Sequence, residues 1–176
     1  MSNTYTYQTI KDTTEHAVIK LTGKFDGTGQ ENDHFRVIAN SLYGALATNG
    51  YPVANVYGGA ANTTLPYYGL SLHRLWYDCS STGDVEIYWH ADTPVPLLFL
   101  NGNGEYDGAG NWVTIPNAAK DTANCKGDIL VTTRGMVAND SYTLIMELRK
   151  DNAHYQRGQF NDPAAFNYGP NFSLRP

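Results

Sequence analysis

The alternation of apolar and polar side chains with a period of two is the feature that most restricts the fold of this chain. Residues 140–150 and 84–90 each read as a segment with one apolar face. The apolar positions are Tyr142, Leu144, Met146 and Leu148 in the first segment and Val85, Ile87 and Trp89 in the second. Because successive side chains of a β-strand point to opposite faces, this pattern predicts two half-buried strands.

Seven further segments have the composition or the alternation of strands. They are residues 4–10, 14–25, 33–39, 70–78, 96–100, 111–116 and 127–135. Turn-forming residues connect them, as in STGD at 81–84 and KGD at 126–128. No helical pattern alternates with these strands, which argues against a βαβ fold. The sequence therefore predicts an all-β fold, an antiparallel and jelly-roll-like β-sandwich of about eight or nine strands.

Two segments depart from the strand pattern. A short helix is expected at 40–50, with Asn40 or Ser41 as its N-cap and Gly50 as its stop. The sandwich domain is expected over residues 1–150, and residues 151–176 are expected to form an irregular C-terminal arm. This arm carries five aromatic residues: Tyr155, Phe160, Phe166, Tyr168 and Phe172. Disordered tails are usually poor in aromatics, so the arm is expected to pack either on its own domain or on a neighbouring subunit.

Charged residues are scarce in this chain, and their distribution restricts the classes of partner that it can bind. Charged residues make up 16% of the sequence and the formal net charge is −5. Lys and Arg form no stripe, so a nucleic-acid partner is not expected. The N-terminus lacks the features of a secretory signal, and no apolar run approaches the roughly 18 residues that cross a bilayer. We expect a soluble protein made in a cytoplasm, without a membrane partner.

The acidic stretch 21–37 raises the question of a metal site. It contains Asp26, Glu31 and Asp33, but the ligand spacing of an EF-hand fails from Asp26 onward. A calcium site of another type, with Asp26, Glu31 and Asp33 as ligands, stays open from the sequence. The simpler interpretation is a connection between two strands, in which Gly27 and Gly29 take positive φ. The glycine-rich segment 101–112 is likewise interpreted as a hairpin.

No motif for catalysis is visible. The five histidines have neither HxH nor HxxxH spacing, and no serine lies in a GxSxG context. Cys79 and Cys125 are expected as two free thiols, although a pair stays possible from the sequence. The sequence predicts no catalytic residues, no metal ligands and no cofactor, and we expect the protein not to be an enzyme.

Several blocks of the sequence resemble virion structural proteins of tailed phages. The blocks are IKDTTEHAVIKLTGKFDGTGQEND, VEIYWHAD, GDILVTTRGMVANDSYTLIMELRKDN and GQFNDPAAFNY, and the chain departs from them at 51–69. The resemblance implies a bacteriophage virion protein with a jelly roll, of the type that decorates or cements the capsid. Its partners would be the major capsid protein or neighbouring subunits, and a homo-oligomer, for example a trimer, is expected. The candidate contact residues are Tyr5, Tyr7, Tyr155, Phe160, Phe166, Tyr168 and Phe172.

A carbohydrate-binding module, for example in a tail or head fibre, is the alternative. Jelly-roll sandwiches often bind sugars, which stack on exposed aromatic rings. The candidates are Tyr67, Tyr68, Trp76, Tyr77, Trp89, Tyr106 and Trp112. Trp89 lies in phase with Val85 and Ile87, however, so its ring is expected in the core.

Overall fold

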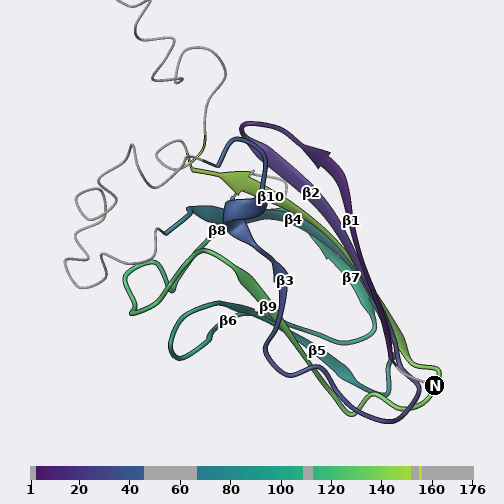
Figure 1. Cartoon of the computed structure of the whole chain (residues 1–176). Coiled ribbons are helices and arrows are strands. Elements are labelled where there is room, and N and C mark those ends of the chain that lie inside the picture. The colour runs from purple at the N-terminus through teal and green to yellow at the C-terminus, as the bar shows by residue number, and fades with distance from the viewer. Residues whose placement is uncertain (1–2, 46–66, 109–112, 152–154, 156–176) are drawn as a thin grey trace, which may run out of the picture.

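The computed structural model describes residues 3–45, 67–108, 113–151 and 155, and nearly all of its regular structure is β (Figure 1). The strands in these ranges are β1 (Thr4–Asp12), β2 (His16–Lys24), β3 (His34–Val37), β4 (Leu70–Cys79), β5 (Asp84–Trp89), β6 (Val95–Leu100), β7 (Asn103–Tyr106), β8 (Ile115–Pro116), β9 (Ile129–Arg134) and β10 (Ser141–Lys150). No helix among the described residues is long and apolar enough to cross a membrane.

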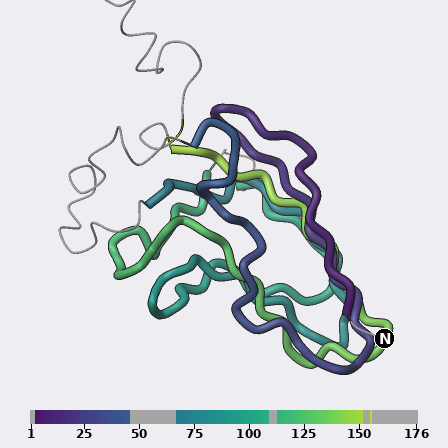
Figure 2. Tube along the Cα trace, viewed as in Figure 1, coloured from purple at the N-terminus to yellow at the C-terminus, as the bar shows by residue number. Residues whose placement is uncertain are grey.

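The strands form two antiparallel sheets that pack as a sandwich. The larger sheet has the order β1-β2-β10-β4-β7, with β8 also paired to β4, and the smaller sheet has the order β3-β9-β5-β6. Apart from β1 and β8, the chain visits the two four-stranded layers in the order of a jelly roll. Figure 2 shows the N-terminal strand at the outer edge of the larger sheet. The prediction of an all-β, jelly-roll-like sandwich is confirmed.

The core lies between the sheets and is built from the predicted alternation. All seven apolar positions identified in β10 and β5 are buried. Residues of β2, β4 and β9 face them, among them Ile19, Leu72 and Ile129. Each large aliphatic side chain removed from water contributes about 1.5–3 kcal/mol, so these paired rows are the main source of stability.

The predicted helix at 40–50 is wrong in the part that the structure describes. A single 3-10 turn covers Ala39–Ser41, Leu42 is extended, and Gly44 has a φ of +77°. Tertiary contacts fix this backbone, because the Asp128 carboxylate accepts the Ala39 N–H (2.8 Å) and the Tyr155 hydroxyl donates to the Ala39 carbonyl (2.7 Å). Residues 46–50 lie outside the described residues.

The interpretation of 101–112 as a hairpin is also wrong in the part that the structure describes, residues 101–108. Strand β6 ends in the smaller sheet and β7 begins in the larger one, so the turn at Gly102 (φ +66°) crosses between the sheets. Strand β7 pairs with β4 instead of folding back on β6. The expected strand at 111–116 is reduced to β8, and residues 111 and 112 lie outside the described residues.

The acidic loop between β2 and β3 holds a buried ion pair. Glu31 has a fully buried side chain that pairs with Arg36 of β3 and accepts a hydrogen bond from the Tyr142 hydroxyl of β10 (2.6 Å). Burial raises the pKa of Tyr142 to about 12, so its hydroxyl remains a donor. Gly27 has the expected positive φ (88°), whereas the second such residue is Asp33 (φ 48°) and not Gly29. The loop therefore joins the two sheets through a carboxylate, an arginine and a tyrosine.

A second buried ion pair fixes the opposite end of β10. The Lys150 ammonium pairs with Asp12 of β1 and donates to the carbonyls of Thr13 (2.7 Å) and Tyr43 (2.8 Å). It also lies 5.1 Å from the centre of the Tyr155 ring. Packing on the sandwich thus continues to Tyr155, beyond the expected domain boundary at residue 150.

Replacing Arg36 by Met should destabilise the fold by about 3–5 kcal/mol, because it leaves the buried Glu31 carboxylate without its cation. The change is measured by guanidinium denaturation. Arg134→Met is the matched control, since Arg134 is mostly exposed beside Glu86 and should cost about 1 kcal/mol or less. Equal effects of the two substitutions would contradict a structural role for the Glu31 pair.

The two cysteines should be slow to react with a disulfide reagent in the native protein. Both are free and buried, and burial, with a smaller effect of Asp78, raises the pKa of Cys79 to about 12. Burial also raises the pKa of Cys125. Thiolate, the reactive form, is therefore scarce at neutral pH. When the protein is denatured without reductant, we expect both thiols to react fast. Fewer than two reactive thiols in the denatured protein would indicate a disulfide. Fast reaction of the native protein would contradict the burial of the two cysteines.

Candidate functional site

An aromatic surface covers the outside of the smaller sheet. Side chains that alternate with the core residues of β3, β9, β5 and β6 point away from the larger sheet. The register places Phe35 opposite Leu130, Leu130 opposite Tyr88, and Phe99 opposite Glu86. We call this surface the aromatic face and define it as Phe35, Tyr88, His90, Phe99 and Leu130.

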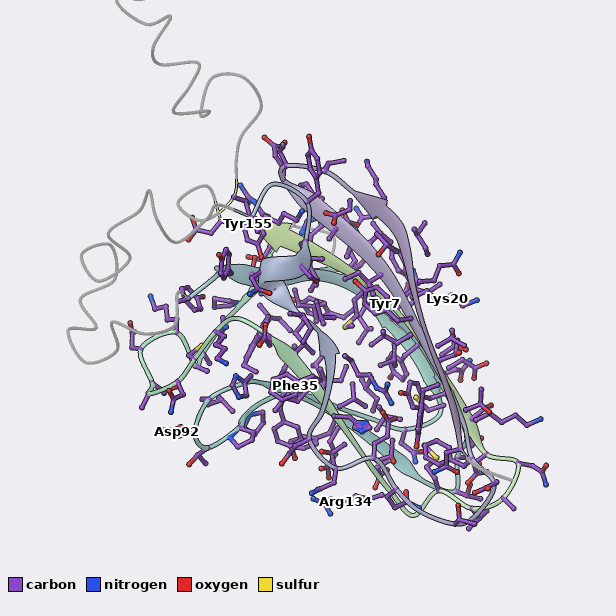
Figure 3. The ribbon with its side chains drawn as sticks, viewed as in Figure 1. Tyr7, Lys20, Phe35, Asp92, Arg134 and Tyr155 are labelled. Atoms are coloured by element: carbon purple, nitrogen blue, oxygen red, sulfur yellow. The ribbon has the colours of Figure 1, made fainter. Side chains whose placement is uncertain are left out.

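The rings of the aromatic face form two contacting pairs. Phe35 and His90 have ring centres 4.8 Å apart, and Tyr88 and Phe99 meet edge to face at 6.1 Å. Phe35 is 50% exposed and Phe99 is 63% exposed, whereas Leu130 is only 2% exposed although it points outward from the sheet. The rings therefore shield Leu130 and leave part of their own apolar area in water. Figure 3 shows Phe35 and Arg134 on the smaller sheet.

Polar side chains border the aromatic face and hold one of its rings. The Tyr88 hydroxyl donates to the Glu86 carboxylate (2.8 Å), and Arg134 Nε donates to both oxygens of Glu86 (3.0 and 3.1 Å). Burial, followed by the bond to Glu86, raises the pKa of Tyr88. These contacts hold the Tyr88 ring in one position on the sheet.

His90 stays neutral at physiological pH. Burial is the largest effect and lowers its pKa from 6.5, although the charge of Asp128 opposes it. A neutral imidazole can pack on Phe35 without the cost of removing a charge from water. The aromatic face therefore presents apolar and aromatic area at neutral pH, with charge at its border.

Phe35 and Phe99 are not among the contact residues predicted from the sequence. Both lie in segments that were expected to be strands, and Tyr88 and His90 fall on the polar side of the alternation in 84–90. Strand β3 has only four residues and β6 carries a register shift beside Pro96, so neither shows a clear period. Only the register across the sheet brings these rings together.

The predicted contact residues fall in different environments. Tyr5 is half-buried, 5.9 Å from Phe25, with Arg36 4.3 Å above its ring. Tyr7 is 47% exposed on β1. The prediction that Tyr155 contacts a partner is wrong, because its ring is fully buried and cannot offer area to a partner. The remaining candidates, Phe160, Phe166, Tyr168 and Phe172, lie outside the described residues.

The candidates for sugar stacking are also distributed unevenly. Trp89 and Tyr68 are buried, Trp76 is 38% exposed, and Tyr67, Tyr77 and Tyr106 pack partly against the core. Trp112 lies outside the described residues. Trp76 projects from the outer face of β4, on the opposite sheet from the aromatic face.

Other polar groupings are part of the larger sheet. His16 Nδ1 lies 3.3 Å from Glu147, and the rings of His16 and His73 meet edge to face at 5.8 Å. Within the described part of the chain, no group of three His, Cys, Asp or Glu side chains could hold a metal ion.

A hollow of about 330 Å³ lies at the ends of β4, β8 and β10, among residues that include Asn117, Lys120 and Arg149. It shares no residue with the aromatic face.

Comparison with family models, with curated proteins and with solved structures gives no match to this chain. The resemblance to phage virion proteins therefore stays a prediction. The geometry of the described residues is the remaining basis for a functional proposal.

The stability of the fold should fall as the pH falls below 6.5, partly because of His90 and His73. Burial is the main effect that lowers both pKa values from 6.5, so the unfolded chain binds more protons below that pH. This part of the stability is complete above pH 6.5 and is lost as the pH falls toward the folded pKa values. The carboxyl groups of Asp26 and Asp140, with pKa values lowered from 3.8, titrate at lower pH.

The prediction is tested with His90→Gln, His73→Gln and the double variant. Each substitution should flatten the pH dependence of the urea midpoint between about pH 5 and 8, where histidine titrates. A double variant with the same slope as the original protein would contradict the assignment.

Proposed function

We propose that this protein is a non-enzymatic structural protein of a tailed-phage virion that decorates or cements the capsid through protein–protein contacts. The observation that carries the proposal is the aromatic face, with Phe35 and Phe99 at least half exposed on the outside of the smaller sheet. The jelly roll, and the resemblance of several sequence blocks to phage virion proteins, are consistent with this role. A protein that binds only the assembled shell stabilises that shell by mass action.

The chemistry of the aromatic face suits a protein partner. Interface centres are enriched in aromatic residues and depleted of charge, and a polar rim surrounds them. Here the rings of Phe35, Tyr88 and Phe99 form the centre, while Glu86 and Arg134 lie at the border. Tyr88 is already held by Glu86, so little freedom would be lost on binding.

Carbohydrate binding is the second candidate function. Tyr88 and Phe99 offer ring faces and edges beside the hydrogen-bonding groups of Glu86 and Arg134. A sugar would stack on Phe99 and bond to these groups. This candidate function places a glycan on the same surface that we assign to a capsid protein. Substitutions at Phe35 and Phe99 therefore affect both functions, and the two are distinguished by testing binding to shells and to glycans separately.

The proposal is tested by co-sedimentation of the purified protein with virions or empty shells of the parent phage. Replacing Phe35 and Phe99 by Ser should weaken binding about 30-fold or more, because loss of an interface aromatic costs about 1 kcal/mol or more and the two together about 2 kcal/mol or more. Tyr43→Ser is the matched control: Tyr43 is as exposed as Phe99 (63%) but lies outside the aromatic face. Saturable pelleting of the original protein and the control, with loss in the double variant, supports the proposal.

Two results would contradict this function. Pelleting that is unaffected by the double substitution removes the aromatic face from the contact. No pelleting, together with glycan binding that Phe99→Ser abolishes, supports the carbohydrate-binding alternative.

A further inference from the structure

Among the residues that the structure describes, strand β1 forms the longest edge of the sandwich and the least protected one. It spans nine residues and, among the described residues, pairs only with β2. The other edges are shorter or interrupted: β3 and β7 have four residues each, β8 has two, and β6 contains Pro96. Proteins usually protect edges by such interruptions or by charge, because an open edge offers unpaired N–H and C=O groups to another strand.

The composition of β1 is that of a strand made for pairing. Residues 4–10 (TYTYQTI) contain no charged side chain and no proline, and the first charge is Lys11. The register with β2 is regular from Thr4 to Thr9 and shifts only after it. Most of these side chains are exposed, including Tyr7 at 47%. Six residues of regular, uncharged edge are therefore available.

The two faces of β1 decide how a second strand could be added. Tyr5, Tyr7 and Thr9 pair with Gly23, Leu21 and Ile19, so they lie on the side that faces the smaller sheet. Thr4, Thr6 and Gln8 lie on the outer side, next to Lys24, Thr22 and Lys20. Figure 3 shows Tyr7 and Lys20 on these opposite sides of the larger sheet.

We propose that β1 pairs antiparallel with β1 of a second copy of this chain, which joins the two larger sheets into one. A two-fold axis perpendicular to the sheet generates this pair and keeps each side chain on its own face. With the axis at Thr6, Tyr7 lies opposite Tyr5 of the second copy, and Thr4 lies opposite Gln8. Aromatic pairs across strands stabilise such a seam, and Lys11 falls outside it.

A second copy fits this edge better than an unrelated peptide, because the edge is complementary to itself. Tyrosines meet tyrosines on one face, and threonine and glutamine meet on the other. The Lys residues of β2 lie on the outer face, one strand away from the seam, so those of the two copies are separated by three inter-strand spacings of about 4.8 Å. This inference concerns how copies meet each other, and it does not depend on the proposed function. It specifies a dimer, whereas the resemblance implied a homo-oligomer for which a trimer was one example.

The proposal is tested by light scattering on the purified chain and on charge variants of the exposed Thr6. The original protein should have twice the 19.4 kDa mass of one chain. Thr6→Lys and Thr6→Glu should each halve that mass, since like charges would meet at the seam, and an equimolar mixture of the two should restore it. Asn103→Lys, at an exposed position of the edge strand β7, is the matched control and should leave the mass doubled.

Hydrogen exchange of residues 4–9 distinguishes the other occupants of the edge. In the proposed dimer, the outward amides are protected at high concentration and exchange on dilution or in Thr6→Lys, which circular dichroism must show to be folded. Protection that persists in a monomer means that a segment of the same chain covers β1, and this result overturns the proposal. A monomer at the highest soluble concentration, a mass of three chains, or a doubled mass in Thr6→Lys also overturns it.

Discussion

The burial of one face of β10 is the constraint on which the rest of the structure depends. Its apolar row must lie between the sheets, so β10 takes a central place and needs a long partner on each side. Strands β2 and β4 run along nearly its whole length. Tyr142 at one end and Lys150 at the other extend the same strand into the two buried ion pairs. The long edge strand β1 follows from this arrangement, because it covers the free side of β2.

The two outer surfaces of the sandwich have different chemistry. The outer face of the larger sheet carries Lys20, Lys24, Arg74, Glu147 and Arg149. The outer face of the smaller sheet carries the aromatic face, and the Glu86–Arg134 ion pair lies beside it. This asymmetry suits a protein that lies on a larger assembly with its smaller sheet toward the assembly. The edge β1 belongs to the larger sheet and lies on a different part of the surface, so the proposed self-pairing and the proposed attachment involve separate residues.

Features that depend on local alternation of side chains were predicted correctly from the sequence. Features that are fixed by contacts between residues far apart in the chain were not. The core rows of β5 and β10 follow from a period of two, and Trp89 was correctly placed in the core. Glu31 could not be assigned, because its partner Tyr142 is 111 positions away. The expected helix at 40–50 failed where Asp128 and Tyr155 fix the Ala39 backbone. The aromatic face was missed because Phe35 and Phe99 meet Leu130 and Tyr88 only through the register between strands.

The central claim is that the aromatic face is buried against another protein in an assembled particle. Hydroxyl-radical footprinting of the free protein and of purified virions, read by mass spectrometry, tests it most directly. The account predicts that oxidation of Phe35, Tyr88 and Phe99 falls in the particle while that of Tyr43 is unchanged. Equal oxidation of Phe99 in both samples, or absence of the chain from the particles, would contradict it.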